Sequence, residues 1–191
     1  MSNLIQQIQN KLDSDFIENA FPVLLHQGVK DEHVYVHSIG CSLWNTLGHE
    51  FDYMAVVEGP APSAAGNDIR SDSVWFDKNT IKPKVLIEYE RFDGTYKGKR
   101  KLLEKLINLI DAAARWQNST ELLVLSFWSQ DLVSLPDFNE LEHVFQNGAV
   151  NNKGAFIQVP TNCQLLINRM MFIKGSDGLL RLKNMTYRCI K

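Results

Sequence analysis

The eight residues ELLVLSFW, at positions 121–128, constrain the fold more than any other stretch of the sequence. They form a nearly unbroken apolar run of strand length. Side chains of a strand alternate between the two faces of the sheet, so such a run places apolar side chains on both faces, and both have to be covered. We therefore expect an interior strand of a sheet. The helical period is clearest just upstream, over residues 99–116. There one apolar stripe gathers Leu102, Leu103, Leu106, Ile107, Ile110, Ala113 and Ala114.

Three further strands are predicted before that helix, at residues 53–59, 71–77 and 84–92. Pro83 stands directly before the third strand, where its missing N–H is tolerated. Residues 32–40 alternate enough to predict a short strand, and residues 41–51 predict a helix that Ser42 caps. The resulting order is helix, three strands, helix, strand, which predicts a mixed α/β fold of the α+β type.

The segments before and after this region are predicted to form further helices and strands. Residues 1–41 predict a helical preface, and residues from about 155 to 191 predict basic C-terminal strands, the last two joined by a turn at 175–178. The core occupies about residues 42–128. At 191 residues, with 45% hydrophobic content, the chain suits one domain spanning 1–191.

Acidic side chains occupy one face of the third strand. Glu88 and Glu90 lie two residues apart, so both point the same way, about 7 Å from each other. At an effective dielectric constant of about 20, the two charges repel by about 2 kcal/mol. Water would offset this cost on an exposed face, which is the simple alternative; otherwise a cation or basic side chains are needed.

A third acid, Asp72, begins the neighbouring strand, so three carboxylates can converge. Carboxylate oxygens are the ligands that Mg2+ prefers, and a bound Mg2+ activates water against a phosphodiester. Asp77 is a competing ligand, but its position beside the next turn predicts a role in that turn. In an unrelated α/β domain with solvated acids, Asp72 and Glu88 would instead lie far apart.

With these acids in this order of elements, residues 42–128 resemble the PD-(D/E)xK nuclease superfamily, which has the restriction-endonuclease-like fold. Ser71 and Asp72 stand where the family has Pro-Asp, and Glu88-Tyr89-Glu90 takes the place of (D/E)xK. Glu50 matches the acid that the first core helix often supplies. The resemblance implies a Mg2+ or Mn2+ ion held by Asp72, Glu88 and Glu90.

Two departures from the family pattern matter. Ser71 replaces the proline, a common change, whereas Glu90 replaces the lysine that helps to orient the attacking water. Some members carry glutamate there, and others move the lysine onto the next helix. Lys101 and Lys105 lie four residues apart on one side of that helix and would fill this role, unless that side simply faces solvent.

The resemblance thus implies a metal-dependent endonuclease acting on DNA. The catalytic set would be Asp72, Glu88, Glu90, Glu50, Lys101 and Lys105. A homodimer is expected by analogy, because cutting both strands needs two sites. The missing lysine motivates the alternative, a protein of this fold that has lost catalysis and binds nucleic acid or a protein partner.

Charge is unevenly distributed along the chain. Residues 1–96 hold 7 basic and 14 acidic side chains, and residues 97–191 hold 13 basic and 8 acidic. This asymmetry predicts a phosphate-binding face beside an acidic site, or two halves whose charges interleave and cancel. Candidate DNA contacts are Lys97, Lys99, Arg100, Arg181 and Lys183. The last two could equally protect a sheet edge.

Other sequence features give weaker signals. No apolar run approaches the length of a membrane span, and the first residues lack a secretory signal, so we expect a cytoplasmic protein. Cys41, Cys163 and Cys189 lack metal-ligand spacing and predict reduced thiols. His33 and His37 are interpreted as surface histidines.

Overall fold

The structure, a computed structural model, describes residues 4–30, 35–62, 69–117 and 119–191. Its fold is mixed α/β, built on a six-stranded sheet. The elements in chain order are α1 (Leu4–Leu12), α2 (Phe16–Ala20), the 3-10 helix η1 (Pro22–Leu24), α3 (Tyr35–Glu50), β1 (Met54–Pro60), β2 (Arg70–Phe76), β3 (Pro83–Arg91), α4 (Tyr96–Arg115), β4 (Leu122–Gln130), α5 (Phe138–Asn147), β5 (Ala149–Val150), β6 (Phe156–Ile157), β7 (Gln164–Lys174) and β8 (Leu180–Ile190).

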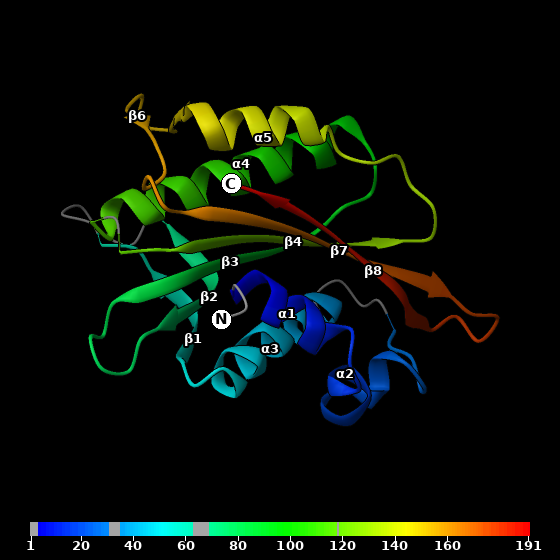
Figure 1. Cartoon of the computed structure of the whole chain (residues 1–191). Helices are drawn as coiled ribbons and strands as arrows, with labels where there is room; N and C mark the ends of the chain where they lie inside the picture. The colour runs from blue at the N-terminus through cyan, green and yellow to red at the C-terminus, as the bar shows by residue number, and fades with distance from the viewer. Residues whose placement is uncertain (1–3, 31–34, 63–68, 118) are drawn as a thin grey trace.

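The six strands lie in the order β1-β2-β3-β4-β7-β8 (Figure 1). The central strands β3, β4 and β7 are parallel, whereas β1, β2 and β8 join antiparallel at the two sides. Eight of the nine residues of β4 are buried, so the predicted interior strand is confirmed. The two C-terminal strands are confirmed as well, and they widen the same sheet instead of forming a separate layer.

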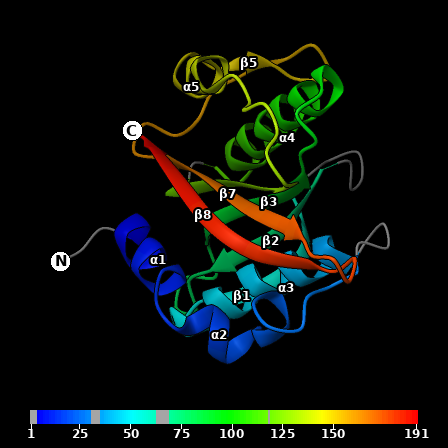
Figure 2. The ribbon, with the colours of Figure 1, turned by 90° about the vertical axis from the view of Figure 1, so that its right-hand side faces the viewer.

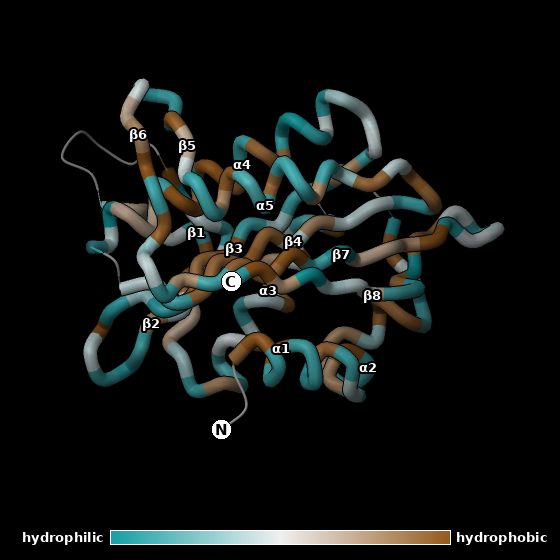
Figure 3. Tube along the Cα trace, turned by 45° about the horizontal axis from the view of Figure 1, so that its top comes forward, coloured by the Kyte–Doolittle hydropathy of each residue, from teal (hydrophilic) through white to brown (hydrophobic). Residues whose placement is uncertain are grey.

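Helices cover both faces of the sheet (Figures 1 and 2). α4 and α5 lie on one face, and α1, α2 and α3 lie on the other. Successive residues of β4 alternate between the two cores: Val124 packs on the α3 side, and Leu123 and Leu125 pack on the α4 side. Figure 3 shows hydrophobic residues concentrated along the central strands. The double covering explains why this strand lacks a polar face.

The long helix α4 forms where the apolar stripe predicts it. Leu102, Leu106 and Ile110 are fully buried against the sheet. At its start, the Thr95 hydroxyl accepts a hydrogen bond from the Gly98 amide, which caps the first turn. The helix follows β3 directly and packs back against β3 and β4.

The strand prediction is wrong for residues 35–40, because the helix α3 begins at Tyr35 and includes them. Residues 31–34, with His33, lie outside the described part of the chain. Ser42 is an interior residue whose hydroxyl donates to the Ser38 carbonyl, so it does not cap the helix. Burial at Val36, Gly40, Leu43, Trp44 and Leu47 follows the helical period that short alternation had obscured.

Gly40 lets α3 approach the sheet at β3. A Cβ atom at this position would lie 1.9 Å from Cε1 of Tyr89, closer than any real contact. The absence of a side chain therefore brings the first turns of α3 onto Tyr89. This approach places the helix beside Asp72 of β2, whose carboxylate lies 3.8 Å from His37.

Across the described ranges, we find no helix with both the length and the apolar character that crossing a bilayer requires.

We predict that Gly40→Ala lowers the melting temperature. An exposed helical Gly→Ala change gains about 1 kcal/mol, but overpacking against the Tyr89 ring costs about 1–3 kcal/mol. Thermal unfolding monitored by circular dichroism measures the balance. Ser38→Ala, at an exposed position of the same helix, is the control and should change stability by less than about 0.5 kcal/mol. A Gly40→Ala protein that melts at or above the parent temperature would contradict the close approach.

Candidate functional site

The candidate site lies where β2 and β3 separate. Their ladder pairs Ser73 with Ile87 and continues from there toward the connecting turn. Past this pair, Oδ2 of Asp72 accepts the Tyr89 amide hydrogen at 2.7 Å. The carboxylate thus takes the place of a ladder partner, and Asp72 is held 7% exposed between the diverging strands.

Glu88 and Glu90 point from β3 toward α4, on the opposite face from Tyr89. Glu88 is 1% exposed and Glu90 is 7% exposed, so the alternative in which these acids face solvent is wrong. Nζ of Lys105 lies 2.7 Å from Oε2 of Glu88, and Nζ of Lys101 lies 2.8 Å from Oε1 of Glu90. Both lysines therefore face the acids, as their spacing on the helix allows.

Burial and mutual repulsion control the charge of the acids. Desolvation and the nearby Asp72 carboxylate raise the pKa of Glu88 to about 8, even with Lys105 in contact. Burial also raises the pKa of Asp72, although the Tyr89 amide, Lys105 and His37 oppose this shift. Glu88 consequently retains its proton at neutral pH, and a bound cation would displace that proton.

Lys105 contacts Glu88 and also acts on Asp72 through its charge. Burial disfavours its ammonium form, but Glu88, Asp72 and Glu90 outweigh this penalty and raise the pKa of Lys105. The side chain therefore carries a positive charge throughout the neutral range. About a quarter of it is exposed, so the charge faces the opening of the site.

The opening is a pocket of about 340 Å³ at the carboxyl ends of the parallel strands. Its lining comprises His37, Asp72, Glu90, Arg91, Lys101, Lys105 and Trp128, with Glu88 held below by Lys105. The Arg91 guanidinium lies 5.0 Å from the centre of the Trp128 ring. A larger pocket of about 760 Å³ at the opposite end of the sheet holds the Lys84–Glu121 ion pair but no comparable group of buried acids among its described residues.

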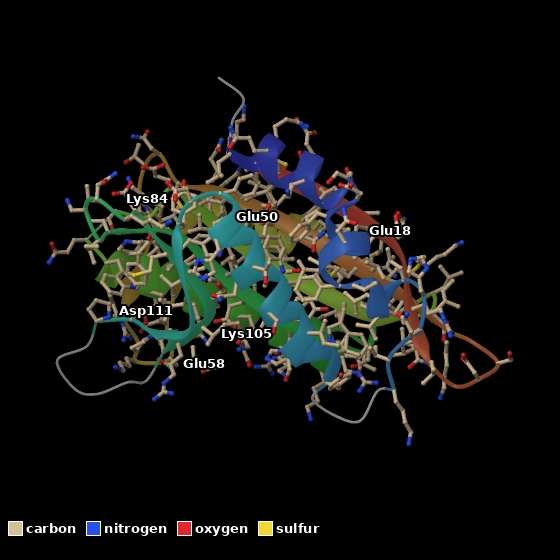
Figure 4. The ribbon with its side chains drawn as sticks, turned by 90° about the horizontal axis from the view of Figure 1, so that it is seen from below. Glu18, Glu50, Glu58, Lys84, Lys105 and Asp111 are labelled. Atoms are coloured by element: carbon tan, nitrogen blue, oxygen red, sulfur yellow. The ribbon has the colours of Figure 1, made fainter. Side chains whose placement is uncertain are left out.

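Glu50 does not join the site, so its predicted assistance to the metal is wrong. It ends α3 on the side that leads to β1 and pairs with Lys11 at 2.9 Å (Figure 4). Thirteen residues of helix separate it from His37, or about 20 Å. Asp77, as predicted, serves the turn: its carboxylate accepts hydrogen bonds from the Asn79 and Thr80 amides.

Three residues near Asp72 were missed by sequence reasoning. His37 Nε2 lies 3.8 Å from Asp72 Oδ1 and 3.5 Å from Cys41 Sγ. Their spacing of four residues would have paired His37 with Cys41 had residues 35–41 been recognised as helix. Glu58 of β1 also acts on Asp72 through its charge, and it adopts a φ of 52°, which is rare outside glycine.

His37, Cys41 and Asp72 together form a group that can hold a metal ion, since their ligand atoms lie within 4.8 Å of one another. Burial raises the pKa of the Cys41 thiol to about 12, with Asp72 and Glu58 adding to the shift. The thiol is therefore protonated at neutral pH until a cation displaces the proton.

The predicted DNA contacts fall into two places. Lys97, Lys99 and Arg100 lie in the first turns of α4, at the same end of the sheet as the pocket. Arg181 pairs with Asp177 at 2.7 Å and also donates to the His26 and Gln27 carbonyls, so it secures the β7–β8 turn. Lys183 is exposed on the edge strand β8. Three strand spacings, or about 14 Å, separate β8 from β3.

We predict that Glu88→Gln stabilises the metal-free protein most at high pH. Because the pKa of Glu88 is raised from 4.5 to about 8, the folded state binds a proton more tightly than the unfolded state, and stability falls as pH rises through this window. The variant lacks this titration, so its gain in melting temperature should be largest above pH 8 and shrink toward pH 4.5. Melting curves in EDTA measure the difference.

Glu104→Gln is the matched control, because Glu104 is an exposed acid on the neighbouring helix α4 and lies 4.0 Å from Arg100. It should leave the pH dependence as in the parent. A Glu88→Gln gain of equal size at every pH would show that Glu88 titrates normally.

Comparison with known proteins gives no relative from which this site could be assigned. A scan of protein-family models, a search of curated proteins and a search of solved structures each find no match to the chain. The residues of the pocket and their geometry therefore carry the assignment of function.

Proposed function

We propose that the protein is a metal-dependent nuclease that hydrolyses phosphodiester bonds of DNA. The observation that carries this proposal is that Asp72 and Lys105 line one pocket, while the buried Glu88 contacts Lys105 and interacts electrostatically with Asp72. Two buried carboxylates on adjacent strands, with a lysine against one of them, combine a cation-binding pair with a positive charge for phosphate.

The arrangement of the elements supports a restriction-endonuclease-like core. α3, β1, β2, β3, α4 and β4 follow the order that the resemblance implies, with acids at the start of β2 and near the end of β3. The position of the motif lysine holds Glu90, while Lys105 reaches Glu88 from the following helix. This agrees with the family variant in which the lysine has moved to that helix.

The donor atoms suit a hard divalent cation. Asp72 and Glu88 offer carboxylate oxygens, which Mg2+ and Mn2+ prefer, and their raised pKa values indicate a pair whose charge is incompletely compensated. Such an ion polarises the phosphodiester and lowers the pKa of a bound water. Lys105 would stabilise charge on the phosphate oxygens, and Lys101 with Glu90 would position the substrate at the mouth. Cutting both strands would use two chains, as a homodimer.

A second candidate function is binding of nucleic acid without cleavage. It is favoured by the two ion pairs, because Lys101 and Lys105 already compensate Glu90 and Glu88. In that case the lysines and acids would be a structural network, and the basic first turns of α4 would supply the affinity.

We predict cleavage of supercoiled plasmid with Mg2+ or Mn2+ and none in EDTA. Asp72→Asn and Glu88→Gln should each lower the rate by about 100-fold or more, because they remove charge at the cation site and keep the shape of the side chain. Gel electrophoresis of nicked and linear products measures the rate, with Glu104→Gln as the control on the exposed face of α4.

Two outcomes would count against the nuclease. Cleavage that both site variants retain would identify a contaminant. Plasmid binding without cleavage, together with melting temperatures that Mg2+ and Mn2+ leave unchanged, would favour the binding module.

We predict that the basic first turns of α4 bind the DNA backbone. Replacing Lys97, Lys99 and Arg100 by alanine should weaken binding and reduce the slope of log affinity against log salt by about 0.9 for each phosphate that these side chains neutralise. Fluorescence anisotropy with a labelled duplex in EDTA measures the slope. Lys78→Ala is the control, since Lys78 pairs with Asp52 beyond the opposite end of β2. An unchanged slope would place the DNA elsewhere.

A further inference from the structure

His37, Cys41 and Asp72 have the separations of ligands around one small metal ion. Cys41 Sγ lies 3.5 Å from His37 Nε2, His37 Nε2 lies 3.8 Å from Asp72 Oδ1, and all three atoms fall within 4.8 Å. A tetrahedral zinc ion with ordinary bond lengths keeps nitrogen, oxygen and sulfur ligands about 3.4–3.6 Å apart. Small side-chain adjustments would therefore close the three atoms around such an ion.

The three side chains are held in place before any ion binds. His37 and Cys41 lie one turn apart on α3, which Gly40 brings against β3. The His37 ring also packs beside the Tyr89 ring, with centroids 6.0 Å apart. Asp72 is fixed by the Tyr89 amide through Oδ2, which leaves Oδ1 directed at His37. The side chain of His37 is 36% exposed, so an ion has a path from solvent.

We propose that His37 Nε2, Cys41 Sγ and Asp72 Oδ1 form a second cation site that takes a zinc-like divalent ion, with a fourth position open to water. The donor set differs from that of the Asp72–Glu88 pair, which offers oxygen alone. Sulfur and imidazole ligands select zinc, cobalt or cadmium, whereas carboxylates select magnesium or manganese. The two neighbouring sites would thus prefer different metal ions.

The two sites share Asp72, which has a consequence that rests on the proposed nuclease function. Oδ2 accepts the Tyr89 amide hydrogen, which leaves Oδ1 as the less engaged ligand atom for either site. A zinc ion held by His37 and Cys41 would take this atom from the Mg2+ site. Zinc is therefore expected to inhibit cleavage by competing for Asp72.

Cobalt titration of the purified full chain tests the site without nucleic acid. After EDTA treatment and dialysis, Co2+ should give a thiolate-to-cobalt charge-transfer band that saturates at one ion per chain, and Zn2+ should abolish it. Cys41→Ser should remove the band, and His37→Ala should weaken Co2+ binding at least tenfold. Circular dichroism verifies that each variant is folded.

The chain supplies matched controls. Cys189→Ser removes an exposed thiol on β8, and Glu88→Gln removes the neighbouring oxygen site; both should keep the band. A parent protein without the band, or a band that survives Cys41→Ser, overturns the proposal.

A second measurement separates this site from the nuclease. Added Zn2+ should lower the cleavage rate of the parent at least tenfold and leave the cleavage rate of Cys41→Ser nearly unchanged. A band without any Mg2+-dependent cleavage keeps the zinc-like site and refutes the nuclease. Cleavage without a band keeps the nuclease and refutes the zinc-like site.

Discussion

The hydrogen bond from the Tyr89 amide to Asp72 is the interaction on which the geometry of the site depends. A backbone amide in a sheet has to be paired, and here a carboxylate on β2 pairs it where the ladder between β2 and β3 stops. The same bond keeps Asp72 buried and directs its free oxygen toward His37. On the other face of β3, alternation sends Glu88 toward α4. Tyr89 therefore fixes Asp72 through its amide, while its neighbours Glu88 and Glu90 contact the lysines of α4.

The site stores unfavourable electrostatic energy that the two lysines only partly relieve. Glu88 is almost completely desolvated, and its pKa of about 8 shows that Lys105 does not outweigh burial and the Asp72 charge. Burying a charge without full compensation costs stability, and proteins retain such groups mainly where chemistry requires them. The raised pKa of Glu88 therefore supports a functional pocket, even though each ion pair alone would suit a purely structural network.

The sequence predicted the sheet and the long helix because their patterns are long. The stripe of α4 spans about three and a half turns, and the β4 run is nearly all apolar, so local exceptions do not alter the interpretation. Asp72, Glu88 and the two lysines followed from strand alternation and helical spacing. The prediction for the first turns of α3 was wrong for two reasons. The stretch HVYVH alternates over five residues, which is typical of a strand. Ser42 also resembles an N-terminal cap, although the helix begins seven residues earlier. Because of that error, the proximity of His37 and Cys41 was not predicted, and Glu50 was taken as the residue that this helix contributes to the site.

The structure shows where the acidic and basic halves of the sequence meet. The acid-rich first half supplies Asp72, Glu88 and Glu90 from β2 and β3, and the basic second half supplies Lys101 and Lys105 from α4. The halves thus interleave at the pocket, as the simpler interpretation held, while the first turns of α4 still present Lys97 and Arg100 to solvent. Because α4 begins directly after β3, one connection brings the acids and the basic turns to the same end of the sheet. Lys105 on α4 therefore reaches the carboxylate of Glu88 on the same face of β3 on which Lys101 reaches Glu90.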